Sequence, residues 1–233
     1  MTTEIGQVLT AAPARRGFAV TVADLRCRYT RDGLRTLSGK IADRLRSTLY
    51  STGEVVVLKK DLGQITKMEF SEALRIEELD GRHLPALYEF NRQRCFSKAD
   101  ARAAAALERG YRGYVGYVGD ELVGYYWWVD AEIEPHHSDI EHYGLDIDLE
   151  PGDVYGFDFY LLERHRGDGK SMEFLYKIEA ALRDLGYDIL WGYVVADNKP
   201  ARWLYSLRGY RPVKKVASRR LLGWSRPIRT VPS

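Results

Sequence analysis

Cysteine is scarce in this sequence, which has only Cys27 and Cys95 among 233 residues. The two form neither a CxxC pair nor a framework of paired cysteines, so we expect ordinary thiols rather than a zinc site or structural disulfides. Long apolar runs are also absent, because a stretch such as Tyr125 to Val129 is far too short to span a bilayer. Residues 1–18 lack the apolar core of a signal peptide. A cytoplasmic location is therefore the default expectation.

Acidic residues are missing from the last part of the chain. The whole sequence has a net charge of +2, with 45% hydrophobic and 29% charged residues, as is ordinary for a globular protein. From Asn198 to Ser233, however, ten residues are basic and none is acidic. A solvated face is the ordinary interpretation of such a run, and an acidic partner is the functional one. No helix-turn-helix or aromatic RNA signature accompanies the charge, so nucleic acid is an unfavoured partner.

One central stretch has the pattern of a strand, a glycine turn and a helix. Residues Val154 to Leu162 are β-branched and aromatic without a helical period, which predicts a buried strand. A glycine-rich turn, Arg166 to Ser171, follows. Apolar residues then recur at helical spacing, and Gly186 marks the end of the predicted helix, whose inner face is Leu175, Ile178, Leu182 and Leu185. The unpaired N–H groups of a helix start favour an anion, so this turn predicts a phosphate-binding site.

Spacing excludes two common phosphate-binding motifs. A Walker A loop needs glycine at position 164, where Arg164 stands, and a dinucleotide fingerprint needs a third glycine at position 172, where Met172 stands. The turn instead resembles the first signature of the GNAT superfamily of N-acetyltransferases, Q/R-x-x-G-x-G/A, with Arg166, Gly169 and Ser171 on its positions.

A second signature follows at the expected separation. A further buried strand is predicted at Ile189 to Val195, and the run Asn198 to Tyr210 closely resembles the family's asparagine, tyrosine-bearing short helix, glycine and aromatic residue. Asn198 suits the helix N-cap, Pro200 its first turn and Gly209 its end. The resemblance covers roughly residues 64 to 225.

The resemblance implies an α/β fold of the acyl-CoA N-acyltransferase kind, with helices flanking a central mixed sheet in which two parallel strands splay apart. It implies acetyl-CoA or another acyl-CoA as co-substrate, with no metal. A backbone N–H near Leu161 to Glu163 would polarise the thioester carbonyl, and Tyr205 would protonate the departing sulfur. The expected coenzyme-binding residues are Leu161, Leu162, Glu163, Arg166, Gly167, Asp168, Gly169, Lys170, Ser171 and Asn198.

The general base is the least defined part of the expected site. Many relatives carry a glutamate on the central strand, but the expected positions hold Tyr155 or Phe157. Asp158 is the only carboxylate between Val154 and Leu162, and desolvation among aromatics would raise its pKa as a base requires. Capping of a nearby backbone group is an equally good interpretation of Asp158. His142 and the carboxylates of the preceding loop come next as candidates.

The remaining sequence predicts three segments. Residues 1–63 form an extension with an amphipathic helix from Leu34 to Leu49 and a strand at Glu54 to Lys59, which acts either as a structural appendage or as a lid or homodimer contact. Residues 64–225 form the acyltransferase domain, and residues 226–233 a loose tail. Within the domain we expect elements at residues 66–76 (strand), 84–91 and 97–109 (helices), 111–118 and 121–130 (an aromatic hairpin), and 210–223 (closing strand).

An acidic loop spans residues 131–153, with eight carboxylates, three histidines and no lysine or arginine. The histidines, His136, His137 and His142, suggest a metal site only weakly, since adjacent histidines on an extended chain point apart. The better functional hypothesis is that Asp146, Asp148 and Glu150 attract a cationic amine. The alternative interpretation is a loop that simply faces water.

The sequence therefore predicts an N-acyltransferase that moves an acyl group, most simply acetyl, from acyl-CoA to a primary amine of a small molecule within a ternary complex. The first alternative keeps the fold but takes the acyl group from an acidic acyl carrier protein docked on the basic segment. The second is a non-catalytic module that binds a ligand or nucleic acid. The acceptor itself has no motif, and fold resemblance alone does not name it.

Overall fold

The computed structural model describes residues 50–70, 74–93, 98–133, 145, 147–166, 169–221 and 224–232. Several residues discussed above lie outside these ranges: the helix expected before residue 50, both cysteines, the three loop histidines, Asp146, Gly167 and Asp168. Side chains are not described for residues 50–52, 98, 99 and 218–232.

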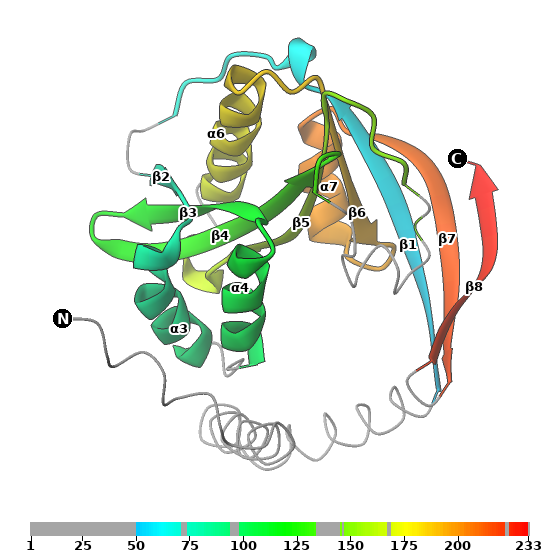
Figure 1. Ribbon diagram of the computed structural model, residues 1–233. Coiled ribbons are helices and arrows are strands. Elements are labelled where there is room, and N and C mark those ends of the chain that lie inside the picture. The colour runs from blue at the N-terminus through cyan, green and yellow to red at the C-terminus, as the bar shows by residue number, and fades with distance from the viewer. Residues whose placement is uncertain are drawn as a thin grey trace, which may run out of the picture.

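Eight strands form one mixed sheet in the order β2-β3-β4-β5-β6-β1-β7-β8 (Figure 1). Only β5 and β6 are parallel among these neighbours, and the other pairs are antiparallel. The strands are β1 Tyr50–Asp61, β2 Leu74–Glu78, β3 Arg112–Val118, β4 Glu121–Asp130, β5 Asp153–Leu161, β6 Ile189–Val195, β7 Arg211–Leu221 and β8 Trp224–Pro232. A mixed sheet flanked by helices is the fold class that the sequence predicts.

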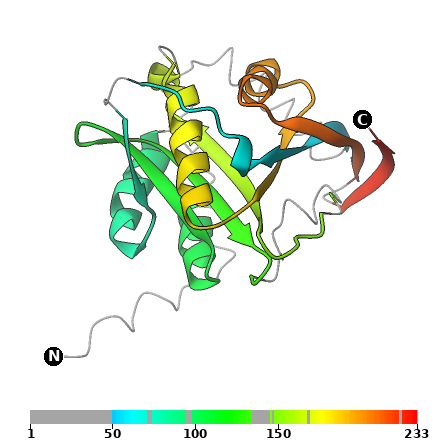
Figure 2. The ribbon, with the colours of Figure 1, turned by 90° about the horizontal axis from the view of Figure 1, so that it is seen from above.

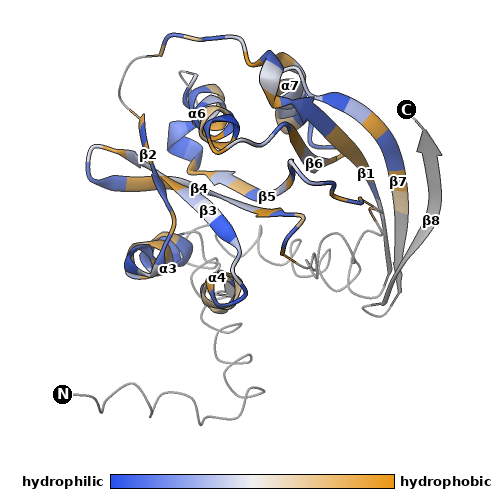
Figure 3. Cartoon of the chain, turned by 45° about the horizontal axis from the view of Figure 1, so that its top comes forward, coloured by the Kyte–Doolittle hydropathy of each residue, from blue (hydrophilic) through white to orange (hydrophobic). Residues whose placement is uncertain are grey.

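Helices cover both faces of this sheet (Figures 1 and 2). Helices α3 Leu84–Gln93 and α4 Lys98–Glu108 lie together on one face, and α6 Lys170–Asp184 and α7 Lys199–Leu207 lie on the other. Short 3₁₀ turns occur at η1 Leu62–Gln64, η2 Gly81–His83 and η3 Glu163–His165. Figure 3 shows hydrophilic and hydrophobic residues on each of α3, α4 and α6, as expected for helices that bury one side against a sheet.

Two apolar clusters fill the space between the sheet and its helices. On the α3–α4 face the cluster includes Phe90, Tyr125 and Phe157, and on the α6–α7 face it includes Tyr126, Phe174 and Ile178. All four aromatic residues of β4, Tyr125 to Trp128, are buried. They alternate between the two clusters because successive strand residues point to opposite faces. The core interpretation of these aromatics is confirmed.

Strand β1 lies inside the sheet, between β6 and β7. It pairs with β6 from Val55↔Val195 to Asp61↔Ile189, and with β7 along its other edge. Val55 and Val57 pack in one core cluster, and Val56 and Leu58 in the other. A strand buried on both faces belongs to the core of the domain, so this part of residues 1–63 is not an appendage outside it. The sequence could not show this, because strand order depends on contacts across the chain.

Three other element predictions differ from the structure. The first strand of the domain is β2 Leu74–Glu78, which is shorter and later than residues 66–76. Residues 226–232, expected as a loose tail, lie in β8, which pairs with β7. Leu185, expected on the inner face of the long helix, is the C-cap residue of α6 and is exposed, because the helix ends at Asp184.

Candidate functional site

The parallel strands β5 and β6 pair over only three residues and then separate. The pairs are Asp153↔Ile189, Val154↔Leu190 and Tyr155↔Trp191. At the paired end, the Trp191 indole Nε1 donates to Asp153 Oδ2 at 2.7 Å and ties the strands together. Beyond Tyr155, β5 continues along β4, and β6 continues along β1. The splayed parallel strands expected from the sequence are therefore present, with Gly156 at the apex of the gap.

The glycine turn ends at the start of α6. Gly169 is the N-cap residue, with φ +75°, a left-handed conformation that favours glycine. Gly169 has no side chain, so the N-cap residue itself offers no side-chain acceptor to the first turn. Lys170 and Ser171 occupy that first turn. This geometry is that of an anion site at a helix N-terminus, while Gly167 and Asp168 lie outside the described residues.

Arg166 is held against the end of β5. Its Nε donates to the Leu161 carbonyl oxygen at 2.9 Å, and its guanidinium lies 5.0 Å from the centre of the Tyr160 ring. The guanidinium is thus fixed near the glycine turn while the residue remains exposed. This placement suits a positive charge beside a phosphate.

The backbone of β5 offers fewer donors to the gap than the sequence suggests. The Leu162 N–H is occupied, because it donates to the Val123 carbonyl oxygen at 2.8 Å. The Tyr160 carbonyl lies against β4, where a Cβ added to Gly124 would come within 2.6 Å of its oxygen. The N–H of Leu161 therefore points to the opposite edge, toward β6, since the two ends of a peptide unit point opposite ways. Glu163 already lies in η3.

Helix α7 begins and ends as its sequence predicts. The Asn198 side chain accepts from the Ala201 N–H at 3.2 Å, Pro200 stands in the first turn, and Gly209 follows the helix with φ +78°. Asn198 is thus a helix cap, and contact with a coenzyme remains a prediction for it.

Tyr205 of α7 is half-buried against the α6–α7 core cluster. Its ring packs edge-on against Tyr210, with 4.8 Å between the ring centres. Burial, and then the Glu179 carboxylate, raises the pKa of Tyr205 well above its ordinary value of 10. The phenol therefore stays protonated at neutral pH and can donate a hydrogen bond.

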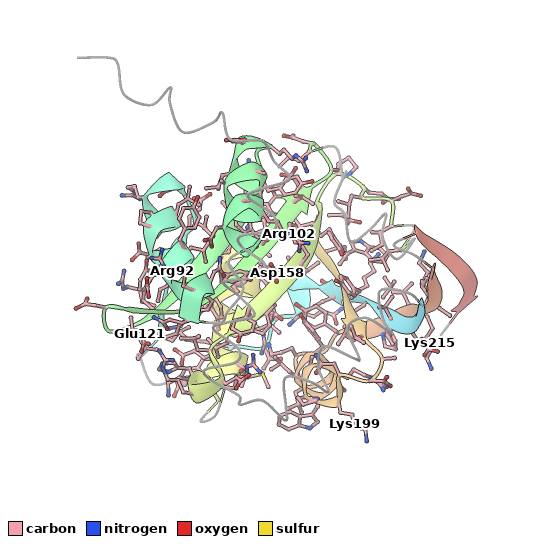
Figure 4. The ribbon with its side chains drawn as sticks, turned by 90° about the horizontal axis from the view of Figure 1, so that it is seen from below. Arg92, Arg102, Glu121, Asp158, Lys199 and Lys215 are labelled. Carbon is pink, nitrogen blue, oxygen red and sulfur yellow. The ribbon has the colours of Figure 1, made fainter. Side chains whose placement is uncertain are left out.

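Asp158 lies at a bulge in β5 rather than in a desolvated pocket. The β4–β5 register moves from Tyr125↔Tyr160 to Trp127↔Phe157, so β5 carries one extra residue. Asp158 has φ +47°, the only positive φ of a non-glycine residue in the described part of the chain, and it is exposed (Figure 4). Tyr125 Oη donates to Asp158 Oδ2 at 3.1 Å. The expected burial among aromatics is therefore wrong, because the bulge turns the carboxylate outward on the α3–α4 face.

A buried ionic cluster lies under α6 and was not predicted. Glu179 is fully buried, and its Oε2 accepts from Lys60 Nζ at 2.5 Å and from Arg208 Nε at 3.1 Å. Lys60 and Arg208 are only 4% and 6% exposed. Burial lowers the pKa of Lys60, and the Glu179 carboxylate opposes this effect. The cluster joins α6, β1 and the residue after α7, which holds the helix of Tyr205 in place.

Two sequence signals could have identified this cluster. Glu179 stands four residues after Leu175 and three before Leu182, on the inner face of the predicted helix. Lys60 continues the alternation of Val56 and Leu58 on one side of a strand. A charged residue at an inward position predicts a buried partner of opposite sign.

The acidic loop is described only in part. Asp148 and Glu150 are exposed, whereas Leu145 and Ile147 are buried in the α3–α4 core cluster. No group of histidine, cysteine and carboxylate side chains in the described residues could hold a metal ion. Within the same residues, no helix combines the length and apolar character needed to cross a membrane.

The model of the acetyltransferase (GNAT) family matches residues 75–210, more than half of the chain. The matched region runs from β2 to the end of the α7 segment and contains the splayed strands, the glycine turn and Tyr205. The chain belongs to the GNAT family. No curated protein matches it.

Solved structures share the fold at low sequence identity. A functionally unknown conserved protein from Staphylococcus epidermidis has a TM-score of 0.53 at 12% identity, over 76% of this chain and 64% of that one. A GCN5-related N-acetyltransferase from Sphaerobacter thermophilus has 0.53 at 15% identity, over 83% and 57%. The glucosamine N-acetyltransferase region of a fungal multi-domain GH3 β-N-acetylglucosaminidase has 0.55 at 15% identity, over 79% and 22%. The chain spans less than two thirds of the length of each of these neighbours.

Proposed function

We propose that this GNAT-family protein is an enzyme that transfers an acyl group, most simply acetyl, from coenzyme A to the primary amine of a small molecule. The gap between β5 and β6 is the observation that carries this proposal. It connects the α6–α7 face, which bears the glycine turn and Tyr205, with the α3–α4 face, which bears Asp158. A donor on one face and an acceptor on the other can meet at such a gap and react within a ternary complex.

The coenzyme in this proposal lies along β5. The start of α6 and the Arg166 guanidinium hold the pyrophosphate, and the Leu161 N–H, which faces β6, pairs with the pantetheine arm. The arm then leads away from Leu161 toward the apex at Gly156, so the thioester lies nearer to Tyr205 than to the glycine turn. This arrangement gives Leu161 a role in holding the arm, rather than in polarising the carbonyl.

The reaction itself is a direct acyl transfer. The neutral amine nitrogen attacks the thioester carbonyl carbon, the C–S bond of the tetrahedral intermediate breaks, and the amine gives up one proton while the thiolate takes one. Tyr205 donates the proton to the sulfur. Asp158 accepts the amine proton, directly or through water, and its exposed carboxylate attracts a cationic acceptor to the α3–α4 face.

The first experiment is a calorimetric titration with coenzyme A and acetyl-CoA, with ATP as the control. We expect tight binding of both coenzymes and none of ATP, followed by release of thiol in the presence of amine acceptors. Binding without turnover over a broad set of amines would favour the non-catalytic ligand-binding alternative. Absence of binding to either coenzyme would contradict the proposal. The proposed function includes a cytoplasmic location.

A donor carried by an acidic acyl carrier protein is the second candidate, and the surface of α7 favours it. Trp203 is 66% exposed and Leu207, four residues later, is 53% exposed. Exposed apolar side chains one helical turn apart form a continuous strip. Basic residues, Lys199 and Arg202, flank this strip, and Lys215 stands apart on β7 (Figure 4). An apolar strip with basic neighbours suits an acidic helical partner.

Charge reversal tests the carrier alternative. Exchange of Lys214, Lys215, Arg219 and Arg220 for glutamate should abolish activity with carrier-bound donors and leave activity with acyl-CoA intact. Trp203→Ala should have the same selective effect if α7 docks the carrier. Equal activity of the wild-type protein and the charge-reversal variant toward carrier donors would exclude docking on β7, and the same result for Trp203→Ala would exclude docking on the α7 strip.

A further inference from the structure

We propose that Tyr126 of β4 provides a second phenol hydroxyl at the transfer point, where it donates a hydrogen bond to the carbonyl oxygen of the thioester. This inference rests on the proposed function and adds to it the group that stabilises the developing oxyanion. Neither of the two family signatures contains Tyr126.

The Tyr126 hydroxyl lies at the apex of the gap. A Cβ added to Gly156 would be 1.5 Å from Tyr126 Oη and 2.4 Å from Cζ, so the phenol fills the space that any other side chain at this position would occupy. Gly156 is the first residue of β5 after the last β5–β6 pair. A Cβ added to Gly192 of β6 would lie 3.4 Å from the Gly156 carbonyl oxygen, so the strands are still close at this point.

Tyr126 stands on β4 opposite the bulge in β5. Tyr126 is the β4 residue that the β4–β5 register skips, between Tyr125↔Tyr160 and Trp127↔Phe157. Its ring points into the α6–α7 core and packs edge-on against Phe159. The same bulge turns Asp158 toward the opposite face, where Tyr125 donates to it. Alternation along β4 therefore directs a phenol to the donor side, and the bulge in β5 directs a carboxylate to the acceptor side.

The surroundings of Tyr126 keep its proton in place. The residue is buried, and burial raises its pKa well above 10, with Tyr205 and Glu179 as the next contributions. Tyr205 and Glu179 are thus electrostatic neighbours of Tyr126, and both tyrosines belong to the α6–α7 side of the sheet. Such a phenol donates a hydrogen bond without losing its proton.

The two phenols therefore have separate tasks. When the amine attacks, the carbonyl π electrons move to oxygen, and Tyr126 stabilises that oxyanion by a hydrogen bond that strengthens as charge develops. When the oxyanion collapses, the C–S bond breaks, and Tyr205 passes its proton to the sulfur. Tyr126 ends the cycle with its proton, so no external oxidant, reductant or metal enters the balance.

The test compares Tyr126→Phe with Tyr205→Phe and with a matched control, Tyr114→Phe. Tyr114 pairs with Tyr126 across β3 and β4 and is buried in the same cluster, but its ring stacks on Trp128. Loss of the Tyr126 hydroxyl should lower kcat by about 10²–10³-fold, the effect of removing one oxyanion donor. The KM for acetyl-CoA should change little, and Tyr114→Phe should retain wild-type kcat.

An infrared measurement separates the two phenols. The carbonyl stretch of isotope-labelled acetyl-CoA should fall on binding to the wild-type protein and to Tyr205→Phe, but not on binding to Tyr126→Phe. The denaturation midpoint of each variant checks that it is folded. A band that shifts equally in the wild-type protein and Tyr126→Phe would overturn this inference alone. Failure of the wild-type protein to bind acetyl-CoA would contradict the proposed function, and this inference with it.

Discussion

Removal of the Glu179 carboxylate should be the most destabilising single change under α6. Glu179→Ala leaves two cations, Lys60 and Arg208, buried at 4% and 6% exposure without the oxygen that both contact. Breaking a buried ion pair in this way costs about 3–5 kcal/mol. Since a domain is stable by only about 5–15 kcal/mol, the variant should lose about a fifth or more of its free energy of unfolding.

Guanidinium unfolding, followed by tryptophan fluorescence, measures this loss. Asp184→Ala is the control on the same helix, because Asp184 is exposed and pairs with the neighbouring, exposed Arg183. It should change stability by less than about 1 kcal/mol. Replacement of all three charged residues with apolar ones (Lys60→Met, Glu179→Leu, Arg208→Met) should recover most of the loss, since both buried cations are then gone. A loss below about 1 kcal/mol in Glu179→Ala would refute the reasoning, because water would then have to reach the cluster.

Three further predictions concern pH, the glycine turn and the candidate base. Burial raises the pKa of Tyr114 from 10 to about 12. Because the pKa is higher in the folded than in the unfolded protein, the protonated phenol contributes to the stability of the fold, fully below pH 10. This contribution is lost as the pH rises toward 12. In unfolding experiments at alkaline pH, Tyr114→Phe should reduce the pH dependence of the free energy of unfolding by up to about 3 kcal/mol. Gly169→Val should cost about 1–2 kcal/mol in unfolding experiments, because φ is +75° there, and should weaken coenzyme A binding in the calorimeter. Asp158→Asn should lower kcat/KM and remove the acidic limb from the pH profile of kcat/KM. An unchanged pH profile would exclude Asp158 as the base.

Local patterns in the sequence predict most of the elements around the candidate site. The apolar run before the glycine turn becomes β5, and the spacing of Leu175, Ile178 and Leu182 places these side chains in the core. Asn198 and Gly209 bound α7 as expected. These successes share one cause, because capping, glycine conformations and hydrophobic periods act over a few neighbouring residues.

The interpretation of Asp158 failed for a different reason. Its apolar neighbours in sequence suggest burial, but one extra residue in β5 relative to β4 turns its side chain outward. A bulge depends on the register of two strands, and that register cannot be read from either strand alone. The same limit applies to Tyr126, which reads as one more core aromatic until its hydroxyl is found over Gly156.

The sequence by itself therefore determined the fold family, the glycine turn and the position of the α7 tyrosine, because each depends on short-range spacing. Only the tertiary structure decided that β1 lies between β6 and β7, where it brings Lys60 to Glu179 and Arg208. It also decided which side chains meet at the gap. Strand order and register join residues that are more than a hundred positions apart, and no local pattern in the chain specifies those contacts.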